Sequence, residues 1–215
     1  AATLAGATLT PVGLIAGDAV TLSGTPAIGT FDNRNAGTGK TITAELSTVT
    51  AGGTDGGNYL LDSSQTSVSG AIGTINKKTV TISAPVISKE YDGTTNYTAG
   101  SAELTALTSQ LGVTGDTIIA AMLNYATRHA GTANKEVTVS GITIDDGNGG
   151  NNYNWSSSGN SASTILPKGV TLTAPVITKV YDGGTGYTTL AADLTTLTGQ
   201  LGVSGDAVTL AAFSY

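Results

Sequence analysis

The sequence has few residues that could do chemistry, and its densest group of oxygen ligands lies in residues 145–152, Asp-Asp-Gly-Asn-Gly-Gly-Asn-Asn. Clustered carboxylate and amide oxygens suit a hard cation, so Asp145 and Asp146 are weak Ca²⁺ candidates. The segment lacks the Glu that closes an EF-hand loop, and the corresponding residues 51–58 keep one carboxylate, Asp55. The sequence therefore favours a Gly/Asn turn over a metal site.

The chain has one histidine, His129, and no cysteine. A transition-metal site would need further His or Cys ligands. A Ser-His-Asp triad finds no support, because the corresponding position of an earlier copy holds Asn35. We expect His129 in an exposed loop, no catalytic or cofactor-binding residue, no cofactor, and a protein that is not an enzyme.

Two neighbouring aromatic residues, Tyr153 and Trp155, could stack on a sugar ring. This gives an alternative function as a carbohydrate-binding module with an exposed aromatic platform. The matching place in the first copy holds Tyr59 alone. Packing in the core or at its rim is therefore the favoured role of these rings.

Composition and charge exclude several classes of protein. The 215 residues carry 9 Lys and Arg against 15 Asp and Glu, a formal charge of -6, so a nucleic-acid backbone is not an expected partner. The longest apolar run, residues 118–123, is far shorter than a membrane-spanning helix. The 30 Gly and 38 Thr are typical of β structure with many turns.

Internal repetition is the strongest signal in the sequence. Residues 78–125 align without a gap on residues 168–215, with 27 identities in 48 positions and a period of 90 residues. An earlier copy is also visible, because residues 17–22 recur unchanged as residues 205–210. A period near 90 is too long for a solenoid and suits one immunoglobulin-like sandwich per repeat.

The chain then divides into three repeats: 1–76, which lacks its N-terminal part, 77–167, which is complete, and 168–215, which lacks its C-terminal part. No Pro- or Ser-rich linker separates them, which favours a stiff rod over a flexible string. Both ends fall inside repeats. We expect the missing halves to come from a longer covalent chain or from identical subunits that exchange strands.

The pattern within a repeat predicts an all-β fold with one short helix. Leu104, Leu107 and Leu111 fall at helical spacing between Ser101, the expected N-cap, and Gly112. The triplet recurs at 194, 197 and 201, whereas residues 6–13 of the first copy contain Pro11 and predict no helix. Strands are predicted at residues 80–82, 86–87, 117–125, 136–140, 142–144 and 161–166. The predicted core contains Val80, Tyr91, Leu104, Leu107, Leu111, Val137, Val139 and Ile144.

One motif order covers essentially the whole chain: Lys-x-Tyr-Asp-Gly-Thr, then Gly-Asp-x-Val-Thr-Leu, Ala-Gly-Thr-x-Lys, Gly-x-x-Tyr and a closing Ile-x-x-Lys. This order resembles the YDG repeat and related MBG-like modules of large bacterial surface proteins, including haemagglutinin-like adhesins. The residues that carry the resemblance most directly are Tyr91, Asp92, Gly93, Tyr181, Asp182 and Gly183. Departures are small, such as Gly184 in place of Thr94.

The resemblance implies an extracellular, non-catalytic, tandem immunoglobulin-like β-sandwich on the bacterial cell surface, used as a stalk or filament segment. Its expected partners are neighbouring repeats of the same or identical chains, and host or cell-surface glycans would bind through another region. By analogy with tyrosine corners, Tyr91 should anchor the core with its hydroxyl on the backbone. Asp92 should form the turn and Gly93 should supply its positive φ.

Overall fold

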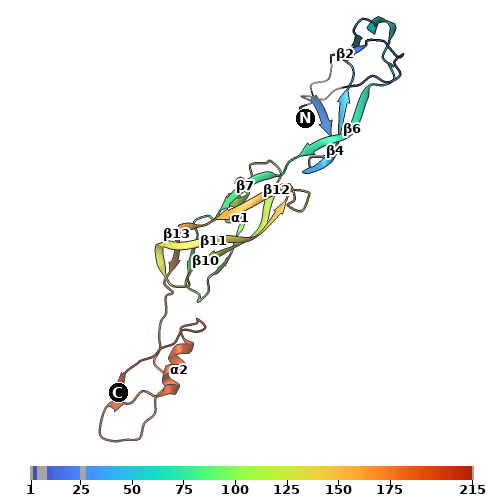
Figure 1. Cartoon of the computed structure of the whole chain (residues 1–215). Helices are drawn as coiled ribbons and strands as arrows, with labels where there is room; N and C mark the ends of the chain where they lie inside the picture. Colours follow the sequence, from blue (N-terminus) through green and yellow to red (C-terminus); the bar gives the residue numbers. More distant parts are fainter. Residues whose placement is uncertain (1, 4–8, 25–27, 215) are drawn as a thin grey trace. The chain divides into compact units, whose positions relative to one another are not determined.

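The computed structural model describes residues 2–3, 9–24 and 28–214, and the chain divides into two compact units. The first unit contains residues 1–79 and 148–154, and the second contains residues 80–147 and 155–215. Regular structure is mostly strand, with two α-helices in the described part of the chain (Figure 1). The all-β class is thus confirmed, while the immunoglobulin-like form of the repeats stays a prediction.

The first unit is built on an antiparallel sheet with strand order β1-β3-β4-β6. Its strands are β1 (Ala2–Thr3), β3 (Ile28–Phe31), β4 (Gly37–Glu45) and β6 (Ser67–Ile75). A separate pair, β2 (Thr21–Ser23) and β5 (Thr50–Gly52), precedes the short 3-10 helix η1 (Gly56–Asn58). Residues 9–13 form no helix, as expected, and residues 6–8 of the same segment lie outside the described residues.

The second unit contains a five-stranded sheet with strand order β8-β13-β11-β10-β9. Its strands are β8 (Ser88–Glu90), β9 (Asn96–Thr98), β10 (Thr117–Tyr125), β11 (Gly131–Asp145) and β13 (Asn160–Leu166). All neighbours pair antiparallel except β8 and β13, which are parallel. The predicted strands at 117–125 and 161–166 are therefore confirmed within about one residue.

The two strands predicted at 136–140 and 142–144 are one strand, β11. The register against β10 shifts between Ala120, which faces Thr143, and Met122, which faces Ser140. Gly141 lies at this shift with φ 59°, a conformation that glycine adopts without steric cost. The glycine that looked like a strand end is a bulge that lets the strand continue.

The small pair β7 (Lys78–Ser83) and β12 (Tyr153–Ser158) forms a sheet of its own. The Lys78 amide donates to the Asn152 carbonyl at 2.8 Å and the Ala84 amide to the Ser158 carbonyl at 2.9 Å, so the strands run parallel. Pro85 follows β7, and the chain leaves the extended pairing before β8 begins. The strand predicted at 86–87 is wrong: residues 84–87 form no strand, because Pro85 has no amide to donate to a ladder, and β8 begins only at Ser88.

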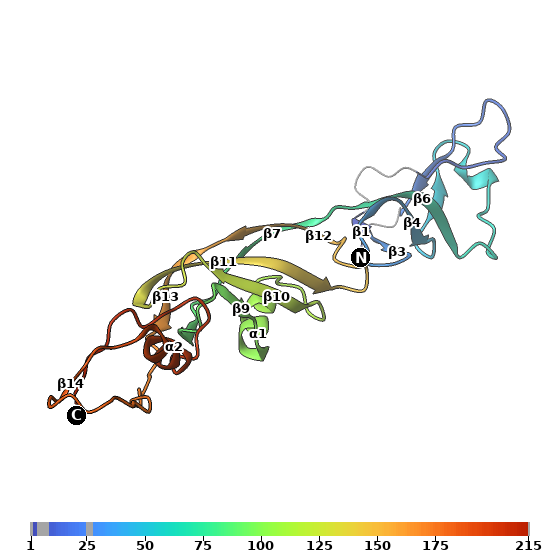
Figure 2. The same cartoon turned by 90° about the horizontal axis from the view of Figure 1, so that it is seen from below.

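Helix α1 (Ser101–Ser109) confirms the predicted helix and lies against β10 (Figure 2). The Ile118 amide donates to the Thr108 hydroxyl at 2.8 Å, which ties the helix to that strand. The expected N-cap was wrong. Gly100 holds that position, and its amide is satisfied by the Glu103 carboxylate at 2.9 Å, because an acid at the third helical position reaches back to the helix start.

The core of the second unit matches the predicted one closely. Six of the eight predicted residues are buried, with Leu107, Leu111 and Val137 completely so, while Tyr91 and Leu104 are half-buried. Leu123 and Ile165 add to this core from β10 and β13. Apolar residues on one face of two paired strands and one helix face thus exclude water together.

The third repeat reproduces the local structure of the second. Helix α2 (Ala191–Gly199) corresponds to α1, and the Val208 amide donates to the Thr198 hydroxyl at 2.9 Å, as Ile118 does to Thr108. Gln110 holds the backbone of Ser83 at 2.7 and 3.1 Å, and Gln200 holds that of Thr173 at 2.7 and 2.9 Å. A short pair, β14 (Gly186–Tyr187) and β15 (Phe213–Ser214), completes the described elements.

We expect Leu107→Ala to lower the free energy of unfolding by about 2–5 kcal/mol, because it opens a cavity beneath α1. The measurement is urea unfolding followed by the fluorescence of Trp155, which is the only tryptophan in the chain and lies in the same unit. The exposed Thr105→Ala on the same helix is the control, with a change within about 0.5 kcal/mol. Equal losses in both variants would contradict this placement of the core.

Candidate functional site

The Lys-x-Tyr-Asp-Gly motif is organised by its lysine. Lys89, at the centre of β8, keeps 9% of its side chain exposed, and its ammonium lies 5.7 Å from the centre of the Tyr125 ring. Its Nζ lies within hydrogen-bond distance of four oxygens, which share its three N–H donors: Asp92 Oδ1 at 2.7 Å, the Thr94 carbonyl at 2.9 Å, Thr94 Oγ1 at 3.1 Å and the Asn96 carbonyl at 3.2 Å. The ammonium therefore gathers the acceptors of residues 92–96 around itself.

Asp92 completes the turn from the other side. Its Oδ1 also accepts from the Thr94 amide at 2.8 Å and the Thr94 hydroxyl at 2.9 Å. Partial burial opposes ionisation of the carboxyl, but the hydrogen bonds from Lys89 and Thr94 outweigh it and lower the pKa of Asp92 to about 2. Gly93 has φ 79°, so the roles predicted for Asp92 and Gly93 are confirmed.

The same turn forms in the third repeat. Lys179 Nζ lies 2.8 Å from Asp182 Oδ1 and donates to the carbonyls of Gly184 at 2.9 Å and Gly186 at 2.8 Å. The Gly184 amide donates to Asp182 Oδ1 at 3.0 Å, and Gly183 has φ 78°. The motif therefore encodes one local structure, whichever repeat carries it.

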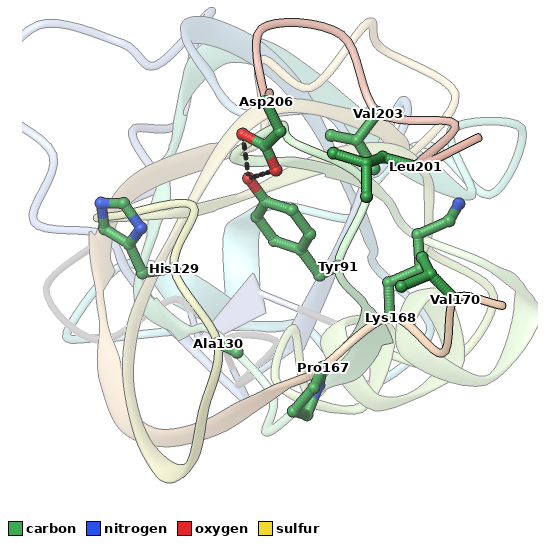
Figure 3. A pocket seen from close by; sticks show the side chains of 9 residues that line it. All are labelled: Tyr91, His129, Ala130, Pro167, Lys168, Val170, Leu201, Val203 and Asp206. Carbon is green, nitrogen blue, oxygen red and sulfur yellow. Dashed lines mark hydrogen bonds between the residues drawn. The ribbon is translucent and has the colours of Figure 1, made fainter. Parts of the chain in front are cut away.

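The prediction that Tyr91 anchors the core with its hydroxyl on the backbone is wrong. Its hydroxyl donates to the Asp206 carboxylate, at 3.0 Å from Oδ1 and 2.8 Å from Oδ2, and Asp206 belongs to the next repeat (Figure 3). Arg128 NH2 lies 3.2 Å from Asp206 Oδ1. The hydrogen bond to Asp206 raises the pKa of Tyr91, because the ionised phenolate would face that carboxylate.

A pocket of about 310 Å³ opens beside this contact (Figure 3). Its lining is mostly apolar, and it includes the hydrogen-bonded pair Tyr91 and Asp206. The lining residues are Tyr91, His129, Ala130, Pro167, Lys168, Val170, Leu201, Val203 and Asp206. His129 is exposed, as predicted, and lines the pocket from a loop of the middle repeat.

The tyrosine that reaches buried backbone is Tyr125. It is 3% exposed at the end of β10, and its hydroxyl donates to the carbonyls of Thr164 at 2.8 Å and Ile87 at 3.3 Å. These carbonyls belong to the β13 strand and the segment before β8, so the phenol joins non-neighbouring parts of the unit. Burial raises the pKa of Tyr125 to about 12.

The remaining candidates do not converge on a site. Asp145 is exposed and Asp146 is buried, and among the described residues no group of three His, Cys, Asp or Glu could hold a metal ion. Trp155 is 41% exposed, whereas Tyr153 is 4% exposed and so cannot present a flat ring to a sugar. The aromatic platform of the alternative function is therefore reduced to one ring.

Sequence reasoning included Lys89 in the motif without assigning it a role, and it missed Arg128 and Asp206 as partners of Tyr91. The recurrence of lysine at 89 and 179, two residues before each tyrosine, was a signal for the role of Lys89. Arg128 and Asp206 are separated by 78 positions (206 − 128), so no local pattern joins them.

These features define a mostly β protein whose Lys-x-Tyr-Asp-Gly turn recurs, braced by its lysine, in the second and third repeats. A family model described as the YDG domain matches residues 1–67 and 76–162, and the chain belongs to this family. Neither curated proteins nor solved structures gave a match. No helix among the described residues has the length and apolar character needed to span a membrane.

Lys89→Met should lower the free energy of unfolding by about 1–3 kcal/mol, because Asp92, Thr94 and Asn96 lose a charged donor in a largely buried place. Urea unfolding followed by Trp155 fluorescence measures the loss. The control is Lys77→Met at an exposed position, with a change within about 0.5 kcal/mol. An unchanged stability in Lys89→Met would refute the bracing role of this ammonium.

Tyr125 should make stability fall at alkaline pH. Its folded pKa of about 12 lies above the ordinary value of about 10, so the folded state holds this proton more tightly. The stabilisation is complete below pH 10 and is lost as the pH rises towards 12. The free energy of unfolding, measured in urea at pH 8 and at pH 11, should differ less between the two pH values in Tyr125→Phe than in the wild type. Equal differences in both proteins would contradict this role of Tyr125.

Proposed function

We propose that this chain is a structural stalk or filament segment of an extracellular bacterial adhesin or surface fibre. It would be built from tandem, non-catalytic, immunoglobulin-like β-sandwich repeats, of which 77–167 is the complete one. The partners would be neighbouring repeats of the same or identical chains, and the location would be the bacterial cell surface. Membership of the YDG domain family supports this proposal.

The observation that carries the proposal is that the polar motif residues bind other parts of the same protein. Lys89 and Asp92 hold each other and the backbone of their own turn. Tyr91 holds Asp206 of the next repeat. The polar motif residues of the second repeat are thus engaged with the protein itself, which suits a part that holds its shape and joins neighbouring repeats.

The junction between repeats supports the same function. Strand β13 ends at Leu166 and still pairs with β8 there, and the third repeat begins at Lys168 after a single proline. Proline restricts its own backbone, and so short a connection leaves little freedom for hinge motion. Repetition with such junctions adds length without adding new chemistry.

The test is to change the number of repeats in the natural protein. Deletion of residues 78–167 removes one 90-residue period and joins Lys77 to Lys168, the residue that aligns with Lys78. Electron microscopy of the surface fibres should show them shorter by one increment, and duplication of the same residues should lengthen them by the same increment. Binding to the host surface per exported molecule should persist in both variants.

Unchanged fibre length in both variants would overturn the stalk function. Loss of binding or of a catalytic activity on deletion, without restoration by a substituted YDG repeat of the same length, would overturn the purely structural assignment. Antibody labelling of intact, unpermeabilised cells tests the location, and labelling only after permeabilisation would contradict it.

A further inference from the structure

We propose that the Tyr-Asp-Gly turn, residues 91–93, and the Gly-Asp loop of the following repeat, residues 203–206, form a specific contact between consecutive repeats. We call this contact the lock. In this lock Tyr91 and Arg128 hold the Asp206 carboxylate, and Gly93 leaves room for Val203. The inference concerns how one repeat recognises the next, and it stands whether or not the chain serves as a stalk.

The polar part of the lock is a charge-assisted contact. The Asp206 carboxylate accepts from the Tyr91 hydroxyl at 2.8 and 3.0 Å, and the Arg128 guanidinium lies 3.2 Å away. The Arg128 and Asp206 side chains are 37% and 30% exposed, so water screens the pair only in part. A hydrogen bond to an ionised group is stronger than a neutral one, so Asp206 is the energetic centre of the contact.

The apolar part depends on a missing side chain. A Cβ placed on Gly93 would lie 2.7 Å from Val203 Cγ1 and 3.5 Å from the Ser204 carbonyl oxygen. Val203 also lines the neighbouring pocket together with Leu201 and Val170 (Figure 3). The glycine of the motif thus has two tasks: it adopts the positive φ of its turn, and it lets the next repeat approach closely.

The third repeat shows the same turn without this contact. Gly183 has φ 78° like Gly93, yet a Cβ there would meet nothing within 4 Å. Tyr181 is 92% exposed, whereas Tyr91 is half-buried. The turn therefore has the same local geometry with and without this contact, so it can offer a following repeat a preorganised surface.

The Gly-Asp half recurs as well. Gly17, Gly115 and Gly205 all have positive φ, at 102°, 91° and 87°. In the first repeat, Asp18 Oδ2 accepts from the Tyr59 hydroxyl at 2.7 Å. Since a carboxylate has two oxygens and about four acceptor sites, one aspartate can hold a tyrosine of its own repeat and the tyrosine and arginine of the preceding repeat.

The test measures how narrowly the second and third repeats are held together. The chain has no cysteine, so Thr138→Cys in β11 and Thr196→Cys in α2, both exposed, place two spin labels without side reactions. Pulsed electron spin resonance then gives the distribution of distances between the labels. We expect one narrow distribution in the otherwise unchanged chain.

Tyr91→Phe removes one hydroxyl and should broaden this distribution, because losing a hydrogen bond to a charged group lowers the ratio of docked to undocked molecules by about tenfold or more. Asp206→Asn should broaden it in the same way from the loop side. In the double variant the broadening should not exceed that of Asp206→Asn alone, since that change already weakens the contacts of Asp206 with both Tyr91 and Arg128.

Tyr181→Phe is the matched control, because it makes the same change in the same motif but outside the contact between the second and third repeats. It should leave the distribution unchanged. Unaltered Trp155 fluorescence would show that each variant keeps its fold. A distribution as narrow in Tyr91→Phe and Asp206→Asn as in the parent, or equal broadening in Tyr181→Phe, would overturn the lock.

Discussion

The Lys89 ammonium is the group on which the motif region depends. A largely buried positive charge is costly unless hydrogen-bond acceptors surround it, and residues 92–96 curl back to supply a carboxylate, a hydroxyl and two carbonyls. This constraint sets the turn, and the turn sets the direction in which Tyr91 points and the place where Gly93 leaves a gap. The contact between Tyr91 and Asp206 therefore depends on the hydrogen bonds that residues 92–96 make to the Lys89 ammonium.

The residues of the Lys-x-Tyr-Asp-Gly motif have two different roles. Lysine and aspartate build the turn in both repeats, since the Lys89–Asp92 and Lys179–Asp182 distances are 2.7 and 2.8 Å. Tyrosine and glycine face outward from it, and their surroundings differ between the repeats. Folding and recognition are therefore assigned to different residues. Because the turn forms from its own residues, a neighbouring repeat can bind to a preorganised surface, which lowers the entropic cost of docking.

Sequence reasoning located the motif residues but not all their partners. Tyr91 was expected to bond the backbone by analogy with tyrosine corners, and Tyr125, which no motif marked, does so instead. The reason is geometric: Tyr125 ends β10, an interior strand of the sheet that contains β13, whereas Tyr91 directly follows the edge strand β8. Position in a sheet depends on strand order, which the order of residues along the chain does not state.

Residues 78–125 and 168–215 test what such a sequence decides alone, because they share 27 of 48 residues. Both form the helix, the turn braced by lysine, and the hydrogen bonds from Gln110 or Gln200 to the backbone of a preceding residue. Each of these features joins residues that lie within about 30 positions of one another along the chain. Only the first forms a strand at 78–83 and buries Val80 and Ile82, whereas Val170 and Leu172 are each 46% exposed. The sheet partners β11, β12 and β13 have no counterpart within 168–215. Strand pairing and the burial of apolar side chains need partners that lie far away along the chain, so only the tertiary structure decided them. The local hydrogen bonds need only neighbouring residues, so the sequence by itself determined them.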